Sequence, residues 1–253
     1  MAAESILAGA TFRPSLAAGD LARARHWYAE KLELVPALER RGELIYRVGR
    51  STFSIFETPD AGTARNTVAA WNVADLRAAM ARFRAHGVVF EDYDFDDLKT
   101  VDGVATNADG TLDAYFIDSE GNTIVLGQPP EAGRPTQFFA ILAAADVDRA
   151  GRWYSEKLGL EPDEQSAGQL VYLGPETTRF VMYQTTSAGT ARNAVGTWLV
   201  SDLADVVREL RRRGVAPDQD SPTSAWFKDS EGNRLALSED RWPFDKANVR
   251  PTA

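Results

Sequence analysis

The residues of this chain that could do chemistry are carboxylates, tyrosines and arginines, because its 253 residues include no cysteine and only two histidines. The absence of cysteine excludes disulfides, thiolate metal sites and cysteine nucleophiles. Asp113 and Tyr115 stand two positions apart in a stretch with strand character, so we expect their side chains on one face of a sheet. Together with Glu57, which ends another apolar run, they are the candidates for acid–base catalysis.

These residues belong to a chain that repeats itself. Asp20 to Leu34 and Asp146 to Leu160 are identical at nine of fifteen positions. Two further motifs recur in the same order and spacing: AGTARN at 61–66 and 188–193, and DSEGN at 118–122 and 229–233. The chain is therefore a duplication, and the proline- and glycine-rich stretch at 127–135 reads as its linker.

Each half has the signals of two successive βαβββ units. Four helices are expected, each with an aspartate as its N-cap: Asp20, Asp75, Asp146 and Asp202. Gly159 suits the left-handed residue that ends the third helix, whereas Glu33 stands at that place in the first half and is expected to carry strain. Short strands are expected at 44–48, 52–57, 67–73, 113–117 and 123–126, with counterparts in the second half.

One segment distinguishes the halves. Val88 and Asp118 are thirty positions apart, and their counterparts Val215 and Asp229 are fourteen positions apart. The first half therefore carries an acidic insertion at about 91–110, which is either a lid or a surface loop. We expect two domains, 8–128 with this insertion and 136–240.

The motifs of the repeat resemble the vicinal-oxygen-chelate superfamily, which includes glyoxalases, extradiol dioxygenases and bleomycin-resistance proteins. The resemblance rests on the helix D-L-x-R-A-x-x-W-Y-x-E-K-L, the D-L helix after the central strand and the D-x-x-G-N hairpin. It covers about 10–127 and 136–239. It implies an α+β fold of tandem domains, each with two βαβββ modules that form a curved mixed sheet around a cup. It also implies a pseudo-dimer within one chain, with a homodimer as the alternative.

Enzymes of this superfamily usually hold a divalent metal through His, Glu or Gln on four strands. The matching positions here are Arg13 and Phe139, Ser54 and Val181, Val68 and Val195, and Val125 and Ala236. Arg13 would place a positive charge where a dication should bind. The histidines, His26 and His86, fall on expected helices where the other half has arginine, which is typical of a solvated surface. We therefore expect no metal and no other cofactor.

Strand alternation predicts what lines the cups instead. Phe56, Asp113, Tyr115 and Thr123 are expected in the first half, and Tyr183, Trp226 and Arg234 in the second. The candidate ligand-binding residues are Arg13, Ser54, Phe56, Val68, Tyr115, Val125, Phe139, Tyr183 and Trp226. Such an aromatic cup suits a flat apolar ligand, although the same rings could simply fill the cup as core. Arg65 and Arg192 in the AGTARN loops are either anion-binding residues or parts of a structural turn.

The net charge of −9 disfavours nucleic acid and anionic membranes as partners and favours a cationic small molecule, while also serving solubility. The longest apolar run, 138–145, is too short to span a bilayer. The first residues do not resemble a signal peptide, so we expect a cytoplasmic protein.

Three functions remain open from these residues. The first is a metal-independent protein that binds and sequesters an aromatic or cationic compound, as antibiotic-resistance relatives do. The second is a lyase or isomerase of the glyoxalase or dioxygenase type that acts on a small metabolite. The third is a non-catalytic interaction protein.

Overall fold

A computed structural model describes residues 5–7, 9–95, 98–131, 136–174 and 178–239. Four βαβββ modules follow one another, as the repeat predicts. In the first half they are β1 (Thr11–Ala18), α1 (Leu21–Leu32), β2 (Leu38–Arg40), β3 (Glu43–Val48), β4 (Ser51–Glu57), then β5 (Thr67–Asn72), α2 (Leu76–Ala85), β6 (Ala105–Thr106), β7 (Leu112–Ile117), β8 (Thr123–Gln128). In the second half they are β9 (Gln137–Ala144), α3 (Val147–Trp153), the π-helical turn η1 (Tyr154–Leu158), β10 (Glu164–Ser166), β11 (Gln169–Leu173), β12 (Thr178–Gln184), then β13 (Ala194–Leu199), α4 (Leu203–Arg212), β14 (Asp218–Ser221), β15 (Ser224–Lys228), β16 (Arg234–Ser238). Parts of the expected insertion (96–97) and linker (132–135) lie outside the described residues, as does residue 240, where the expected second domain ends.

The helix termini follow the expected signals. The Asp20 side chain accepts hydrogen bonds from the backbone N–H groups of Ala22 and Arg23, at 2.9 and 3.0 Å. Gly159 takes the left-handed conformation with φ of 68°, and Glu33 is forced into the same region with φ of 57°. A non-glycine residue there is strained, so the first half keeps a cost that the second half avoids.

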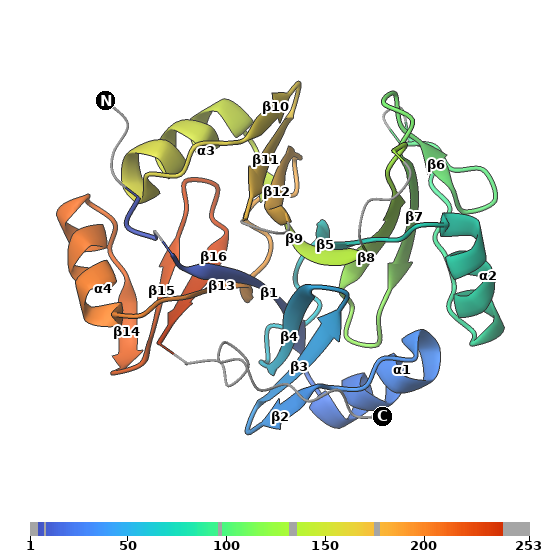
Figure 1. Ribbon diagram of the computed structural model, residues 1–253, viewed down its shortest axis with the longest axis horizontal. Coiled ribbons are helices and arrows are strands. Elements are labelled where there is room, and N and C mark those ends of the chain that lie inside the picture. The colour runs from blue at the N-terminus through green and yellow to red at the C-terminus, as the bar shows by residue number, and fades with distance from the viewer. Residues whose placement is uncertain (1–4, 8, 96–97, 132–135, 175–177, 240–253) are drawn as a thin grey trace.

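The strands form two eight-stranded mixed sheets (Figure 1). Sheet 1 has the order β14-β15-β16-β13-β1-β4-β3-β2, and sheet 2 has the order β10-β11-β12-β9-β5-β8-β7-β6. An antiparallel pair joins the two modules of each sheet, β1 with β13 in sheet 1 and β5 with β9 in sheet 2. In Figure 1, α3 and α4 lie at one side of the molecule and α1 and α2 at the other. We call the face of sheet 1 that is turned away from the helices cup 1, and that of sheet 2 cup 2.

The α+β class and the paired modules are as expected, but each sheet takes its two modules from different halves of the chain. Within one half, the helix-bearing faces of the two modules pack on each other: Tyr28 and Phe53 of the first module share a core with Met80 and Phe116 of the second. This packing leaves β1 and β5 with open edges, which pair with β13 and β9 of the other half. Each half therefore has its own core, while the sheets and the cups run between the halves. We retain 8–128 and 136–240 as the proposed duplicated units.

The first strand of each half also reaches into the core of the other. The Phe12 ring packs in the second half, with its centroid 4.7 Å from that of Trp198. Phe138 packs in the first half, 4.1 Å from Phe53. Gly196 makes room for this exchange, because a Cβ there would lie 2.0 Å from the Phe12 ring. The two halves are therefore interlocked by side chains as well as by strands.

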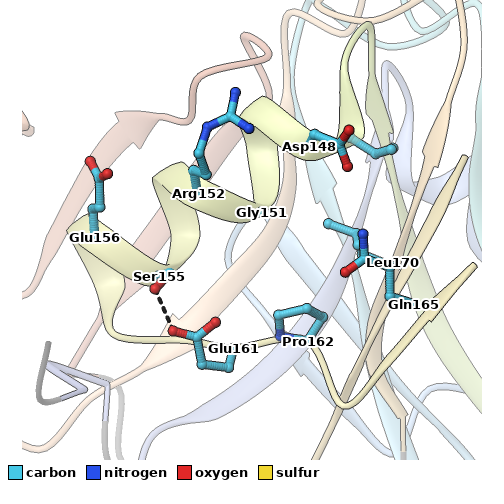
Figure 2. A pocket seen from close by; sticks show the side chains of 10 residues that line it. Asp148, Gly151, Arg152, Ser155, Glu156, Glu161, Pro162, Gln165 and Leu170 are labelled. Carbon is cyan, nitrogen blue, oxygen red and sulfur yellow. Dashed lines mark hydrogen bonds between the residues drawn. The ribbon is translucent and has the colours of Figure 1, made fainter. Parts of the chain in front are cut away.

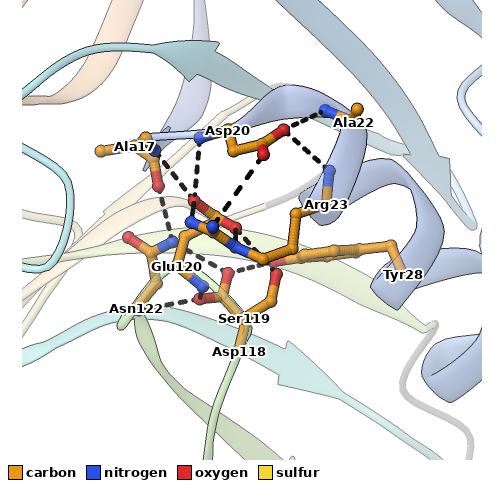
Figure 3. Close-up of polar contacts among 10 residues, drawn as sticks. Ala17, Asp20, Ala22, Arg23, Tyr28, Asp118, Ser119, Glu120 and Asn122 are labelled. Carbon is orange, nitrogen blue, oxygen red and sulfur yellow. Dashed lines mark hydrogen bonds and ion pairs between the residues drawn. The ribbon is translucent and has the colours of Figure 1, made fainter.

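The DSEGN segment forms the expected hairpin, and its buried acidic side chains form a polar clamp between the sheets (Figure 3). Asp118 accepts hydrogen bonds from the Tyr28 hydroxyl and from Asn122 Nδ2, both at 2.8 Å. Glu120 accepts two hydrogen bonds from the Arg23 guanidinium, both at 2.8 Å. Tyr28 and Arg23 come from α1, beside sheet 1, whereas the hairpin belongs to sheet 2. The clamp therefore fixes the angle between the two modules of one half.

The second copy of the clamp has the same contacts. Tyr154 donates to Asp229 at 3.0 Å, and the Arg149 guanidinium donates to Glu231 at 2.8 Å. Burial raises the pKa of Asp229 to about 6, against the hydrogen bonds that Asn233 and other donors make to it. The repeated motif is therefore explained by a structural role. No helix among the described residues is long and apolar enough to cross a membrane.

Candidate functional site

Cup 2 has an apolar floor that is separate from the helix-side cores. Its buried residues are Ala70, Val125, Phe139, Ile141 and Val181. Phe139, Ala70, Val125 and Tyr115 stand opposite one another in a row across β9, β5, β8 and β7. This row takes one residue from the second half and three from the first, so the site exists only when the two halves pair.

Three tyrosines surround this floor. Tyr115 on β7 and Tyr183 on β12 pack against it from its two sides. The Tyr93 ring meets the Tyr115 ring edge-on, with centroids 5.4 Å apart, and stacks on Phe95 at 5.6 Å. Burial raises the pKa of Tyr115, and the negative charge of Asp113 raises it further. The tyrosines are therefore neutral at ordinary pH and offer ring faces and hydroxyl groups to a ligand.

Asp113 is the carboxylate of cup 2. Its Oδ2 accepts a hydrogen bond from Asn107 Nδ2 at 2.7 Å. Gly127 opposite it has no side chain, and a Cβ there would lie 3.2 Å from Asp113 Oδ1 and 2.9 Å from Asn72 Oδ1. Burial raises the pKa of Asp113 to about 6, while the Asn107 hydrogen bond opposes this rise. The group can therefore hold a negative charge beside aromatic rings near neutral pH, or exchange a proton there.

The insertion of the first half lies beside this carboxylate. Glu91 donates its backbone N–H to the Tyr115 carbonyl at 2.8 Å, and the Gly103 N–H donates to the Asp92 carboxylate at 2.9 Å. Strand β6 then pairs with β7, with Ala105 opposite Asp113. The described part of the insertion is thus tied to the wall of cup 2, and its Tyr93 belongs to the site. Sequence alternation missed Tyr93 because this segment has no counterpart in the other half.

Cup 1 has the opposite chemistry. The Arg13 side chain passes from β1 over β4 to β3, where its Nη2 lies 3.0 Å from Glu43 Oε1. Only 4% of the Arg13 side chain and 21% of the Glu43 side chain is exposed. Burial lowers the pKa of Arg13, and Arg40 adds to this effect, while Glu43 opposes it. The floor of cup 1 is therefore covered by an internal ion pair.

Hydroxyl groups lie below this ion pair. Ser15 Oγ lies 2.9 Å from Thr197 Oγ1 and 3.4 Å from Ser54 Oγ. Ser15 and Ser54 are almost fully buried, and they join β1 to β4 and β13. Ser15 and Ser54 of this network correspond to Ile141 and Val181 of cup 2, which are apolar. Neither Ser15 nor Glu43 was among the predicted site residues, because their partners are distant in sequence.

The metal positions expected from the resemblance do not fit a divalent ion in either cup. At these positions cup 1 has Arg13, Ser54 and Ala236, and cup 2 has Phe139, Val181 and Val125. Thr197 and Ala70 lie in the cups where Val195 and Val68 were expected. A cation, two hydroxyls and apolar groups are not the carboxylate and imidazole donors that such a site needs. Among the residues that the structure describes, no three His, Asp or Glu side chains gather as a metal site.

Val68 is one expected cup residue that lies elsewhere. A β-bulge shifts the register of β5 between Thr67 and Ala69. As a result Val68 packs in the helix-side core, and Ala70 takes the place in cup 2 that was expected for it. Val195 is displaced in the same way by the bulge of β13.

The remaining predicted residues are divided between the two sheets. Phe56 lies opposite Glu43 in sheet 1, and Trp226 lies opposite Ala236 in the same sheet, with the Arg234 guanidinium 5.8 Å from its ring. Glu57 is exposed at the end of β4 in sheet 1, whereas Asp113 and Tyr115 are in sheet 2. The three catalytic candidates are therefore not brought together, and only Asp113 and Tyr115 are neighbours.

The two AGTARN loops meet each other. The Arg65 N–H donates to Thr190 Oγ1 at 3.0 Å, and the Arg192 N–H donates to Thr63 Oγ1 at 3.1 Å. This reciprocal pair supports the structural-turn interpretation of the motif. The histidines lie on the outer surface: His26 Nε2 is 3.2 Å from Glu30, and His86 Nε2 is 3.1 Å from Glu33.

Comparison with known proteins identifies the fold. No protein-family model matches the chain, and no curated protein sequence matches it. Among solved structures, glyoxalase I from Zea mays superposes with a TM-score of 0.63 at 14% identity, covering 92% of this chain and 94% of that one. A proposed dioxygenase from Bacillus subtilis superposes with a TM-score of 0.58 at 14% identity, covering 89% of this chain and 83% of that one. At these identities the likeness establishes the fold alone.

Proposed function

We propose, from the vicinal-oxygen-chelate fold that this chain has, that it binds a flat aromatic cation in cup 2 without a metal ion. Glyoxalase I and the dioxygenase share the architecture, and their titles do not determine the ligand of this chain. The proposal therefore rests on the side chains of cup 2.

The observation that carries it is one carboxylate among aromatic and apolar groups. Phe139 and Val125 offer a flat apolar floor, and Tyr115 and Tyr93 offer rings that meet edge-on. Aromatic pairs contribute about 0.5–1.5 kcal/mol beyond burial, and a cation over a ring contributes about 0.5–2 kcal/mol. Asp113 supplies the opposite charge. An acidic chain with a net charge of −9 also attracts such a ligand.

Cup 1 is not the favoured site, because its own ion pair covers its floor. A cation entering it would meet the buried Arg13 guanidinium, and an apolar ring would leave Arg13 and Glu43 without water. The lid role of the insertion belongs to the same proposal: the chain of rings from Tyr115 through Tyr93 to Phe95 leads from the cup to the surface.

Calorimetric titration with N-methylquinolinium and with neutral quinoline tests this proposal, since the two rings differ mainly in charge. We expect tighter binding of the cation. Tyr115→Ala and Asp113→Asn should each weaken it about tenfold, which corresponds to about 1.4 kcal/mol. Trp226→Ala is the matched control, because Trp226 holds in cup 1 the place that Tyr115 holds in cup 2. Equal binding of both rings, or equal loss in the control, would contradict the proposal.

A second candidate function is proton transfer on the bound compound. It is favoured by the pKa of Asp113, about 6, which suits a general base near neutral pH. The test is solvent deuterium exchange into the acidic methyl group of N-methylquinaldinium, followed by NMR. Exchange that is accelerated by the protein and lost in Asp113→Asn would make the protein an enzyme. Binding with no acceleration leaves sequestration as the function, and no binding of any probe would favour the non-catalytic interaction protein.

A further inference from the structure

A cavity lies on the outer surface of the second half, away from both cups. It has a volume of about 330 Å³ between the helix α3–η1 and the segment that leads to β10 (Figure 2). Its lining residues are Val147, Asp148, Gly151, Arg152, Ser155, Glu156, Glu161, Pro162, Gln165 and Leu170. In Figure 2, Glu161 and Pro162 lie below the helix, and the Glu161 carboxylate is hydrogen-bonded to Ser155. We call this cavity the α3 pocket.

The first half has an ion pair at the corresponding place. The alignment of the two helices sets Arg25 against Gly151, and the same register sets Glu39 against Gln165. In the first half, Arg25 Nε donates to Glu39 Oε1 at 2.7 Å, so its guanidinium bridges the helix and β2. The second half has Gly151 in place of this arginine and Gln165 in place of Glu39, and both residues line the cavity. The duplicated chain thus has an ion pair, with both side chains at least half exposed, at the place where the second half has a cavity.

The charges around the α3 pocket also differ between the two halves. Asp148 and Glu161 stand where the first half has Ala22 and Val35. The charges also act differently on the pKa of the equivalent buried tyrosines, Tyr46 in the first half and Tyr172 in the second. Burial raises the pKa of Tyr172, and the nearby negative charges of Glu161 and Asp163 raise it further. Burial also raises the pKa of Tyr46 in the first half, where the positive charge of Arg25 lowers it and the negative charge of Glu39 raises it. The lining of the pocket therefore carries three carboxylates, Asp148, Glu156 and Glu161, and one arginine, Arg152, which stands where the first half has His26.

The backbone around the pocket differs as well. Helix α1 stays α-helical over Leu21–Leu32, whereas the second half changes from α3 to the π-helical turn η1 at Tyr154. Such turns are rare and often mark functional sites. Gly151 sits in the helix without a positive φ, and a Cβ there would meet only the end of the Leu170 side chain at 3.2 Å. Because glycine weakens a helix and nothing in the backbone requires it, Gly151 is best explained by the space it leaves.

We propose that the α3 pocket binds a guanidinium group, which takes the place that Arg25 holds in the first half. The planar group would donate paired hydrogen bonds to Glu161 and neighbouring acceptors, as arginine does to carboxylates. The group comes either from a free small molecule or from an arginine side chain of a protein partner. This inference does not depend on the proposed function of cup 2.

An NMR titration of the ¹⁵N-labelled full chain with methylguanidinium tests the proposal at the Gly151 amide. We expect saturable shifts of Gly151, Gln165 and Leu170. Methylammonium has no planar fork and should bind at least about threefold more weakly. Glu161→Gln should weaken methylguanidinium binding by about three- to tenfold, because a neutral acceptor replaces a charged one. Shifts that do not saturate, or that are equal for both cations, would overturn it.

The first half provides the matched variants. Gly151→Arg combined with Gln165→Glu rebuilds the pair of the first half, and we expect it to abolish binding. Gly151→Ala adds one methyl group without a guanidinium and should retain it. Arg25→Gly should open a second site beside Glu39, seen as new saturable shifts around β2. Undiminished binding by the rebuilt pair would contradict the proposal even if Arg25→Gly failed to fold.

The two sources of the group are separated by two further ligands, N-acetylarginine amide and a pentapeptide with arginine between alanines. Equal affinity means that only the guanidinium end is recognised, as for a free small molecule. A tighter peptide means that the neighbouring backbone is also bound, as for a protein partner. Failure of both to shift the Gly151 amide would overturn the proposal. Tyr115→Ala should leave these titrations unchanged, so a failed cup 2 and a failed α3 pocket are distinguishable.

Discussion

Cup 1 and cup 2 are built by the same strands in the same order, yet equivalent positions carry opposite chemistry. Arg13 of cup 1 corresponds to Phe139 of cup 2, and Glu43 corresponds to Gln169. Hydroxyl groups under the Arg13 side chain are replaced by the apolar floor of cup 2. Both halves are needed for each cup, so neither cup can be assigned to one ancestral copy. The fold determines where side chains converge, and only their identity decides between a closed ion pair and a ligand site.

The two cups also differ in the segments that surround them. The insertion is present only in the first half, and it brings Tyr93 to the wall of cup 2. The corresponding edge of sheet 1 ends at β14, which follows α4 closely. The floor of cup 1 is therefore covered by the side chain of Arg13, whereas the insertion of the first half flanks cup 2.

The largest expected effect comes from breaking the ion pair of cup 1. Removing one partner of a buried pair costs about 3–5 kcal/mol, and Arg13→Met should fall at the lower end because Glu43 is 21% exposed. Glu43→Gln, which introduces the residue of cup 2, should destabilise less. The double variant should cost less than the sum of the two, as measured by chemical denaturation. The same cycle with Phe139→Leu and Gln169→Ala in cup 2 should be additive, and additivity in cup 1 would refute the coupling.

A smaller effect on stability is expected on the helix side of the sheets, where Phe12 packs in the core of the second half and Phe138 in that of the first. Gly196→Ala places a methyl group against the Phe12 ring and should lower the free energy of unfolding by about 1–3 kcal/mol. The equivalent residue beneath cup 2 is Ala69, and Ala69→Gly should cost only about 0.5–1 kcal/mol through backbone entropy. Thermal unfolding of both variants checks this, and an unchanged Gly196→Ala would show that the exchange is loosely packed.

The smallest expected effect is a pH dependence of ligand affinity, which tests whether Asp113 supplies the negative charge of cup 2. The pKa of Asp113 in the folded chain is about 6, above its ordinary value of 3.8, so the group becomes ionised as the pH rises through 6. Affinity for N-methylquinolinium should therefore rise about tenfold between pH 5 and pH 7.5, and affinity for quinoline should not. Asp113→Asn should bind the cation with no such pH dependence. A flat profile in the unmodified protein would remove Asp113 from the site.

The same shift has a consequence for stability without ligand. The folded chain holds the Asp113 proton more tightly than the unfolded chain, so this group lowers stability as the pH rises from about 4 to about 6. Asp229 has a raised pKa as well, and contributes in the same direction. The difference between the unmodified protein and Asp113→Asn over this range isolates the contribution of Asp113.

Much of the fold could be predicted from local signals. Aspartate caps and glycine ends set the helices, and alternation set which face Tyr115 and Tyr183 occupy. Their meeting in one cup could not be predicted, because the pairing of open strand edges depends on how the helix-bearing faces pack. Val68 was expected in the cup because a bulge that changes alternation has no mark in a single sequence. The buried partner of Arg13 was equally hidden, since Glu43 lies on a strand that is not its neighbour.

The pairing of β1 with β13 sets Thr11 opposite Leu199. The first strand can therefore complete its pairing only after a distant part of the chain has been made. Pairings of this kind slow folding, because a large loop must close before they form. During synthesis on the ribosome, the first half emerges with the edges of β1 and β5 unoccupied, and such edges attract other strands. We therefore expect misassembly between two nascent chains to be the characteristic folding error of this protein.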